Sequence, residues 1–250
     1  MNYVFSPKGE IRIEVGATGM DAVKGVRAAS MTDPGASDEV ATGMLVAPGR
    51  VGIWHDHYIS FRLDLDIDGP TNSFRRERLA PRRLDGVRRS LWTLDPVVMP
   101  KEGAVLPGHS PELWRVVNPG VLTTLGHKPG YEIIVGHGAT SLLAAEDPAQ
   151  KRVAFTAAPL WVTAYDAGER YAAGPWPNQA PGGEGLPAYV AQERPIEHAD
   201  VVIWATMGFH HLTRPEDWPV LPTKWHSISL KPYGFFTRNP AITLRREAAP

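Results

Sequence analysis

Apolar and polar residues alternate along several short segments of this chain. Residues 10–15 and residues 61–66 alternate without interruption, a period of two that places every second side chain on one face of a strand. Residues 131–135 and 160–165 are short runs of β-branched and aromatic residues flanked by glycine and proline, and residues 200–206 form a third apolar run. All five segments are predicted to be strands.

Helical patterns are scarce beside these strands. The stretch from Leu142 to Ala149 is helix-like but too short to form a layer of an α/β fold, and no repeat with a period of about 20–50 residues is present. The 24 glycines and 24 prolines separate the apolar runs, as the turns of a sandwich require. We therefore expect an all-β protein, a large β-sandwich in which residues 1–250 form a single domain.

Charge and composition narrow the choice of partners. The net charge is −1, so there is no electrostatic reason to expect nucleic acid or a membrane surface as partner. The most basic stretch, residues 75–89, is broken by acidic residues and Pro81, and we interpret it as a solvated connecting segment. No apolar run approaches the ~20 residues of a membrane span, no signal-peptide pattern follows Met1, and cysteine is absent. We expect a cytoplasmic protein.

Two histidines, His55 and His57, open the alternating segment that runs to Asp66. Residues two apart on a strand point to the same side, so both imidazoles can reach one metal ion, with a third ligand from a distant strand. Imidazole suits copper, zinc, iron or nickel, and this pair alone does not select among them. By the same spacing Asp64 and Asp66 can share a face, where hard oxygen ligands suit calcium or manganese. Histidines and carboxylates without any metal are the alternative interpretation.

Residues 206–219 carry the most distinctive motif of the chain. They contain Thr-x-Gly-x-x-His ending at His211, followed by Glu-Asp-x-Pro. This run resembles the C-terminal copper-site signature of the copper amine oxidases. The His-x-His segment that leads through an apolar strand to Asp-x-Asp-Gly resembles a second block of that family. Other similar segments extend the resemblance from about residue 9 to residue 241.

The resemblance implies two metal sites. The copper ligands it implies are three histidines: His55, His57 and His211. The ligands it implies for a second ion, Ca²⁺ or Mn²⁺, are three carboxylates and two backbone carbonyls: Asp64, Asp66, Asp200, Leu65 and Val201. It also implies the β-sandwich of the family's catalytic domain, a homodimer with arms exchanged between subunits, and oxidation of a primary amine by O2 to an aldehyde, with release of ammonia and hydrogen peroxide.

The organic cofactor of that family, topaquinone, is made from a tyrosine within Asn-Tyr-Asp/Glu. Asn2-Tyr3 is followed by Val4, and no other tyrosine of the chain follows an asparagine. We therefore expect the cofactor tyrosine and the aspartate that acts as base to lie before Met1, so that the domain is N-terminally truncated. Topaquinone would then come from another chain, a complementing N-terminal amine oxidase polypeptide.

Two alternatives remain open at this point. One is a non-catalytic β-sandwich that binds copper and calcium. The other is a mononuclear copper enzyme that works without a quinone, because a three-histidine copper ion with open positions can bind oxygen or water. Among the other histidines, His210 is expected to point to the opposite face of its strand, and His226 is a candidate neighbour of the copper site. The rest are expected at the surface or in loops: His109, His127, His137 and His198.

Overall fold

The computed structural model describes residues 1–86, 89–136 and 138–244. The strands are β1 (Asn2–Phe5), β2 (Ile11–Met20), β3 (Val23–Gly25), β4 (Gly43–Ala47), β5 (Arg50–Ile53), β6 (His55–Asp64), β7 (Ser73–Arg83), β8 (Ser90–Val98), β9 (Gly103–Val105), β10 (Glu112–Val117), β11 (Gly130–Val135), β12 (Leu160–Ala164), β13 (Val201–His211) and β14 (Val220–Tyr233). The helices are short: α1 (Ala36–Glu39), α2 (Pro148–Arg152), α3 (Leu186–Val190) and the 3-10 turns η1 (Ala154–Ala157), η2 (Pro215–Asp217) and η3 (Pro240–Thr243). Within the described ranges, no helix has the length and hydropathy of a membrane span.

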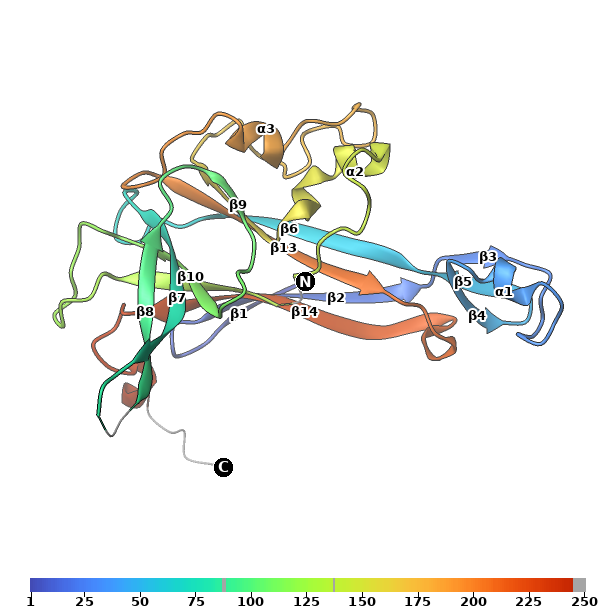
Figure 1. Ribbon diagram of the computed structural model, residues 1–250, viewed down its shortest axis with the longest axis horizontal. Helices are drawn as coiled ribbons and strands as arrows, with labels where there is room; N and C mark the ends of the chain where they lie inside the picture. The colour runs from blue at the N-terminus through green and yellow to red at the C-terminus, as the bar shows by residue number, and fades with distance from the viewer. Residues whose placement is uncertain (87–88, 137, 245–250) are drawn as a thin grey trace.

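The strands form three antiparallel sheets. The largest has seven strands in the order β1-β2-β14-β11-β10-β7-β8, and the second has four in the order β6-β13-β12-β9. A small sheet, β3-β5-β4, forms a separate lobe with α1 at one end of the molecule (Figure 1). The all-β expectation is confirmed, and the strands predicted from alternation and apolar runs are present as β2, β6, β11, β12 and β13.

The core lies between the seven-stranded and four-stranded sheets. Phe74 and Ile228 from the larger sheet pack with Leu160 and Ile203 from the smaller one in a single buried cluster. Burial of this apolar surface is the main force that holds the two sheets together. The two sheets therefore form a sandwich because each buries its apolar face against the other.

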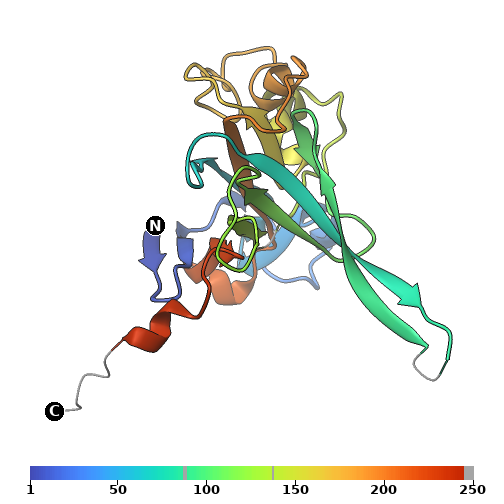
Figure 2. The same cartoon turned by 90° about the vertical axis from the view of Figure 1, so that its left-hand side faces the viewer.

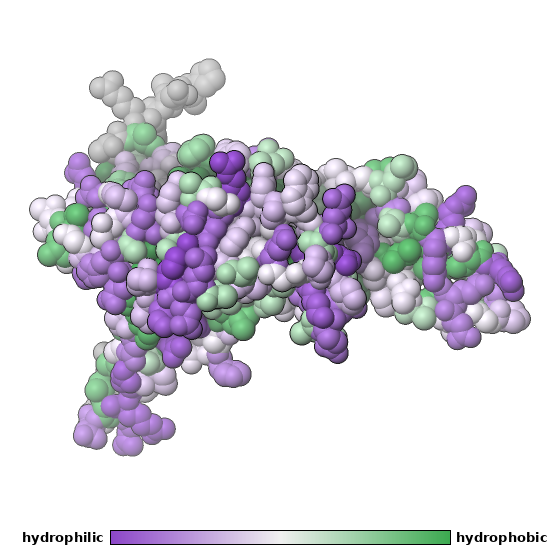
Figure 3. Space-filling model, turned by 90° about the horizontal axis from the view of Figure 1, so that it is seen from above, coloured by the Kyte–Doolittle hydropathy of each residue, from purple (hydrophilic) through white to green (hydrophobic). Residues whose placement is uncertain are grey.

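The four-stranded sheet is also covered on its outer face. Along β13, Ile203 and Ala205 face the sandwich core, whereas Val202 and Trp204 face a second cluster that includes Leu186 of α3. Both faces of β13 are therefore buried, which explains its continuous apolar sequence. Figure 1 shows α2 and α3 above this sheet, and the view from above in Figure 3 shows many hydrophilic residues on the surface there, with apolar residues in small groups.

The interpretation of the arginine-rich stretch as a connecting segment is wrong. Most of it is strand β7, which pairs with β10 and β8 and forms with β8 a hairpin that projects from the body (Figure 2). Its charges are partnered across strands, because Arg76 pairs with Glu112 at 2.6 Å and Glu77 pairs with Arg115. Residues 87–88 of that stretch lie outside the described residues.

Candidate metal centre

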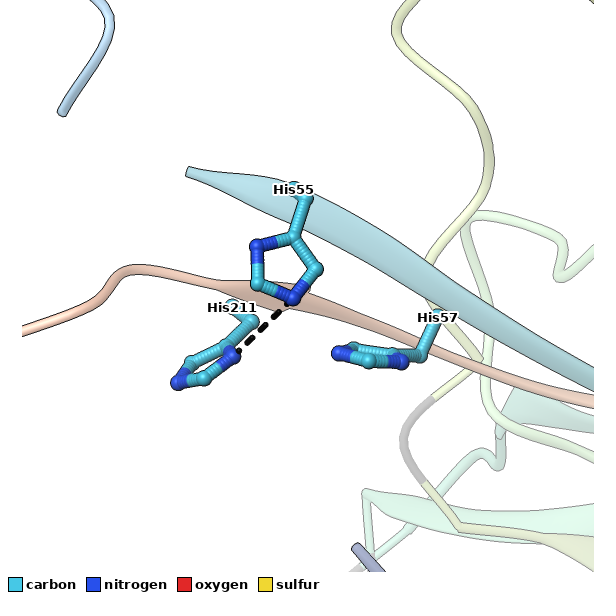
Figure 4. Close-up of side chains that lie close together, drawn as sticks. All are labelled: His55, His57 and His211. Carbon is cyan, nitrogen blue, oxygen red and sulfur yellow. Dashed lines mark hydrogen bonds between the residues drawn. The ribbon is translucent and has the colours of Figure 1, made fainter. Parts of the chain in front are cut away.

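Three histidines converge where β6 begins and β13 ends. His55 and His57 occupy the first and third positions of β6, and the antiparallel register places His211, the last residue of β13, directly opposite His55. One ring nitrogen of each histidine lies within 4.8 Å of those of the other two. Figure 4 shows the three rings turned toward one another on the same face of the strand pair. The expected group of histidines is therefore brought together.

The hydrogen bonds of His55 fix which of its nitrogens is available. Its Nδ1 lies 2.7 Å from the carbonyl oxygen of Ile53, which can only accept, so Nδ1 carries the proton and Nε2 keeps a lone pair. That Nε2 lies 3.4 Å from Nδ1 of His211. Two nitrogens bound to one ion at about 2.0–2.1 Å would lie about 3–3.5 Å apart, so this spacing fits a shared metal.

The environment favours neutral imidazoles, the form that binds metals. Burial lowers the pKa of His57, and the neighbouring His55 and His211 lower it further. Burial also lowers the pKa of His211, with contributions from Lys224 and His55 in the same direction. Both side chains are therefore kept ready for coordination at neutral pH.

Packing holds the ring of His57 in place. The ring stacks on Phe209 with centroids 4.7 Å apart, and Phe209 stacks in turn on His226 at 4.0 Å. His226 thus reaches the site through Phe209. The role of Phe209 was not predicted, although its place two residues before His211 puts it on the same face of β13.

Two carboxylates near the outer nitrogen of His211 were also missed. Nε2 of His211 is buried without a hydrogen-bond partner, 3.8 Å from Oδ1 of Asp21 and 3.9 Å from Oδ2 of Asp217. Asp217 belongs to the Glu-Asp-x-Pro motif, which is a signal the sequence offered. Asp21 follows the end of β2, where no sequence pattern marks it.

A cavity of about 230 Å³ adjoins the histidines. His55, His57, Asp21 and Leu221 are among its lining residues. The cavity leaves one side of the histidine cluster open to a small molecule.

The remaining histidines lie elsewhere. His210 points away from the cluster, as expected, and its Nδ1 contacts Oδ1 of Asp56 at 2.7 Å. Asp56 also accepts a hydrogen bond from the hydroxyl of Tyr58, and burial together with Asp56 raises the pKa of Tyr58 to about 12. The expectation of surface positions holds for three others, His109, His127 and His198. His137 lies outside the described residues.

A second cluster consists of three acidic side chains. Asp64 ends β6, Asp66 follows it, and Asp200 immediately precedes β13, with carboxylate oxygens within 4.8 Å of one another. Burial raises the pKa of Asp200, and the charges of Asp64 and Asp66 raise it further. Oδ1 of Asp200 is buried without a hydrogen-bond partner. Such a group of like charges fits a hard cation.

The two backbone carbonyls expected in this second site have different surroundings. The carbonyl of Leu65 accepts a hydrogen bond from the amide of Ile67 at 3.1 Å, which leaves one of its two lone pairs. Val201 is the first residue of β13 and pairs with Ala164. Both residues are adjacent in sequence to the clustered carboxylates.

Comparisons with known proteins identify similar sequences. The profile of a protein family described as "Copper amine oxidase, enzyme domain" matches residues 1–249. The chain is 37% identical to the peroxisomal copper-containing amine oxidase alpha 3 of Arabidopsis thaliana over 97% of its own length and 36% of that protein. It is 34% identical to a primary amine oxidase of Klebsiella aerogenes, over 96% of its own length and 33% of the relative. The chain therefore spans about a third of the length of these relatives.

Solved structures agree. A copper-containing benzylamine oxidase from Hansenula polymorpha superposes with a TM-score of 0.90 at 28% identity, covering 98% of this chain and 38% of the other. A lysyl oxidase from Pichia pastoris superposes with a TM-score of 0.82 at 18% identity, covering 97% of this chain and 34% of the other. The second likeness concerns the fold alone, and both confirm the expected β-sandwich class.

Proposed function

The chain belongs to the copper amine oxidase family, and from this premise we propose that it forms the copper-binding part of a primary-amine oxidase. The observation that carries the proposal is the convergence of His55, His57 and His211, with mutually facing nitrogens at a spacing that fits one ion. The reaction is the oxidation of a primary amine, RCH2NH2, with O2 and water to an aldehyde, ammonia and hydrogen peroxide.

Each residue of the centre has a distinct task. His55 presents Nε2 because Ile53 holds its Nδ1 proton, and His211 presents Nδ1. His57 is kept neutral by burial and held by the stacked ring of Phe209. Copper bound there would supply a Lewis-acidic and redox-active centre. The adjoining cavity gives O2 or water a route to the open side of the site.

The quinone is proposed to come from a polypeptide segment outside residues 1–250. Tyr3 follows an asparagine but precedes Val4, where the cofactor motif needs an acidic residue. In the described part of the chain, β1 holds Tyr3 in an ordinary antiparallel pairing opposite Ile13. We propose that the amine substrate and the aspartate base belong with that segment.

We propose a second ion, Ca²⁺ or Mn²⁺, on the carboxylates of Asp64, Asp66 and Asp200, with the carbonyls of Leu65 and Val201. The clustered charges and the buried Oδ1 of Asp200 support this site. Its role is structural, because the ion would join the end of β6 to the start of β13. The two metal sites therefore lie at opposite ends of the same strand pair.

We also propose a homodimer in which the β7–β8 hairpin reaches the second subunit. The hairpin projects from the body (Figure 2), and Trp92 on it is 66% exposed. Tryptophan is a frequent anchor of protein–protein interfaces, and Trp92 is placed on the projecting hairpin where a second subunit could cover it.

Two other functions remain candidates, each for one reason. A copper- and calcium-binding sandwich without turnover is a candidate because residues 1–250 contain no Asn-Tyr-Asp/Glu motif. A quinone-independent copper enzyme is favoured by the cavity beside three histidines.

One experiment separates the three. Copper-loaded chain is assayed for hydrogen peroxide with a panel of primary amines, alone and together with a polypeptide that carries the Asn-Tyr-Asp/Glu segment, and is stained for quinone. We expect peroxide and quinone only in the mixture. Peroxide from the chain alone without quinone would establish the quinone-independent enzyme. Copper binding with no peroxide in either assay would establish the non-catalytic protein.

A further inference from the structure

We propose that Asp21 is a positioning residue and counter-ion of the copper centre, acting through the outer nitrogen of His211 to favour Cu²⁺ over Cu⁺. The inference rests on the proposed copper site and deepens it. Asp21 is none of the three histidines and lies outside the motifs described above.

The His211 side chain, which links Asp21 to the proposed copper ion, is only 2% exposed. In the proposed site this residue binds through Nδ1, so its proton is on Nε2. That N–H group has no hydrogen-bond partner, and the carboxylates of Asp21 and Asp217 flank it at 3.8 and 3.9 Å. Carboxylates behind a metal-bound imidazole orient the ring and make it a stronger donor.

The two carboxylates differ in how their charge is compensated. Asp217 contacts Arg214 at 3.1 Å and Lys224 at 3.5 Å, and the hydrogen bond from Arg214 helps to hold the pKa of Asp217 below its usual value. Asp217 therefore already has two cationic partners.

Asp21 has no such compensation. Its side chain is 2% exposed, and its Oδ2 is buried without a hydrogen-bond partner. Among the described residues, His211 alone forms an ion-pair contact with it, and neither lysine nor arginine does. A buried carboxylate without a cation is costly. A divalent ion on the other side of the imidazole would provide the missing positive charge.

Asp21 reaches the side chain of His211 from a different sheet than the one that carries the three histidines. Asp21 follows the last residue of β2, Met20, which pairs with Val220 at the start of β14. The residue also lines the cavity beside His55 and His57. The seven-stranded sheet thus contributes a negative charge to a centre whose ligands come from the four-stranded sheet.

The charge state of the metal gives the inference its measurable consequence. A negative charge stabilises a doubly charged ion more than a singly charged one at the same place. Loss of the Asp21 carboxylate should therefore weaken Cu²⁺ binding more than Cu⁺ binding. A purely structural role would weaken both by the same factor.

The test compares dissociation constants for Cu²⁺ and Cu⁺, each measured by competition with a chelator, in the unmodified chain and in Asp21→Asn. We expect Asp21→Asn to weaken Cu²⁺ binding by about 10–100-fold. The loss for Cu⁺ should be clearly smaller, and the Cu²⁺ electron paramagnetic resonance spectrum should change. Asp21→Ala serves as a second variant with the same expectation. The control is Asp95→Asn, a carboxylate on the β7–β8 hairpin that pairs with Arg82, which should leave both constants unchanged.

The metal-free proteins provide an independent readout. Because Asp21 is a buried carboxylate without a cation, Asp21→Asn should melt at or above the temperature of the unmodified chain when no copper is present. Unchanged copper constants in Asp21→Asn and Asp21→Ala, or equal losses for both oxidation states, would overturn this inference while the copper site stands. An unmodified chain that binds no copper would overturn the copper site and this inference together.

Discussion

Single side chains at the two proposed metal sites differ in the hydrogen bonds that their neighbours provide. The carbonyl of Ile53 accepts hydrogen bonds from Nδ1 of His55 and from Oγ1 of Thr213, so one backbone group orients a ligand and the segment after β13. At the proposed second site, by contrast, Oδ1 of Asp200 is buried without a hydrogen-bond partner. At the proposed copper site a hydrogen bond orients one ligand, His55, whereas the proposed second site gathers three carboxylates.

The raised pKa of Asp200 leads to a prediction about stability and pH. A carboxyl group whose pKa is raised above 3.8 by folding favours its neutral form in the native state, so its stabilising contribution is lost as the pH rises through the raised value. In the presence of a chelator, the unmodified chain should therefore lose stability relative to Asp200→Asn as the pH rises from about 3.8 through the raised pKa of Asp200. Melting temperatures of both proteins, measured from pH 4 to pH 7, check this.

Added Ca²⁺ should reverse the effect in the unmodified chain only. The ion would neutralise the three carboxylates, so the melting temperature near pH 7 should rise with Ca²⁺ and stay constant in Asp200→Asn. Mn²⁺ is tested in parallel to decide between the two ions. Equal calcium responses in the two proteins would contradict the proposed second site.

Among the elements, the hairpin of β7 and β8 shows that strand pairing, and not local charge, determines whether a charged segment is a strand or a solvated loop. In sequence, residues 75–83 look like a solvated segment because five of the nine are arginines and the run is broken by Glu77 and Pro81. In the fold, Glu77 is buried between Arg75 at 3.2 Å and Arg115, and Arg115 lies 4.0 Å from the ring centroid of Tyr233. Arg115 comes from β10 and Tyr233 from β14, and local sequence gives no information about either contact.

Removing the charge of Glu77 should therefore be destabilising. Glu77→Gln keeps the shape of the side chain but leaves the largely buried guanidinium of Arg115 without its carboxylate, and the free energy of unfolding should fall by about 3–5 kcal/mol. The control is Asp95→Asn, which breaks an exposed pair with Arg82 and should cost less than about 1 kcal/mol. Urea denaturation of both variants measures the difference. Similar losses in the two would contradict the assignment of Glu77 as a buried anchor.

For the whole molecule, the sequence predicted the architecture better than the site. Alternation and apolar runs were enough to indicate strands, and the histidine spacing on β6 indicated two ligands on one face. The meeting of His211 with His55 depends on the register between β6 and β13, which only the resemblance to a family implied. Asp21 could not be predicted, because it reaches His211 from the other sheet.

The proposed homodimer can be tested at the projecting β7–β8 hairpin. Trp92→Glu should weaken the proposed homodimer, because a charge would replace a large apolar side chain at the contact. Trp176→Glu is the matched control, since Trp176 is 69% exposed but lies in the loop between β12 and α3, outside the hairpin. Sedimentation velocity across a range of concentrations measures the dimer fraction. Equal dimer fractions in the two variants would remove the hairpin from the interface.

The central claim is the copper site itself, and copper content tests it most directly. The unmodified chain, loaded with Cu²⁺ and then dialysed, is compared by elemental analysis with His211→Ala and with His210→Ala, the neighbouring histidine that faces away. We predict one copper ion per chain in the unmodified protein and in His210→Ala, and loss of stoichiometric copper in His211→Ala. Full copper occupancy in His211→Ala, or none in the unmodified chain, would contradict the account.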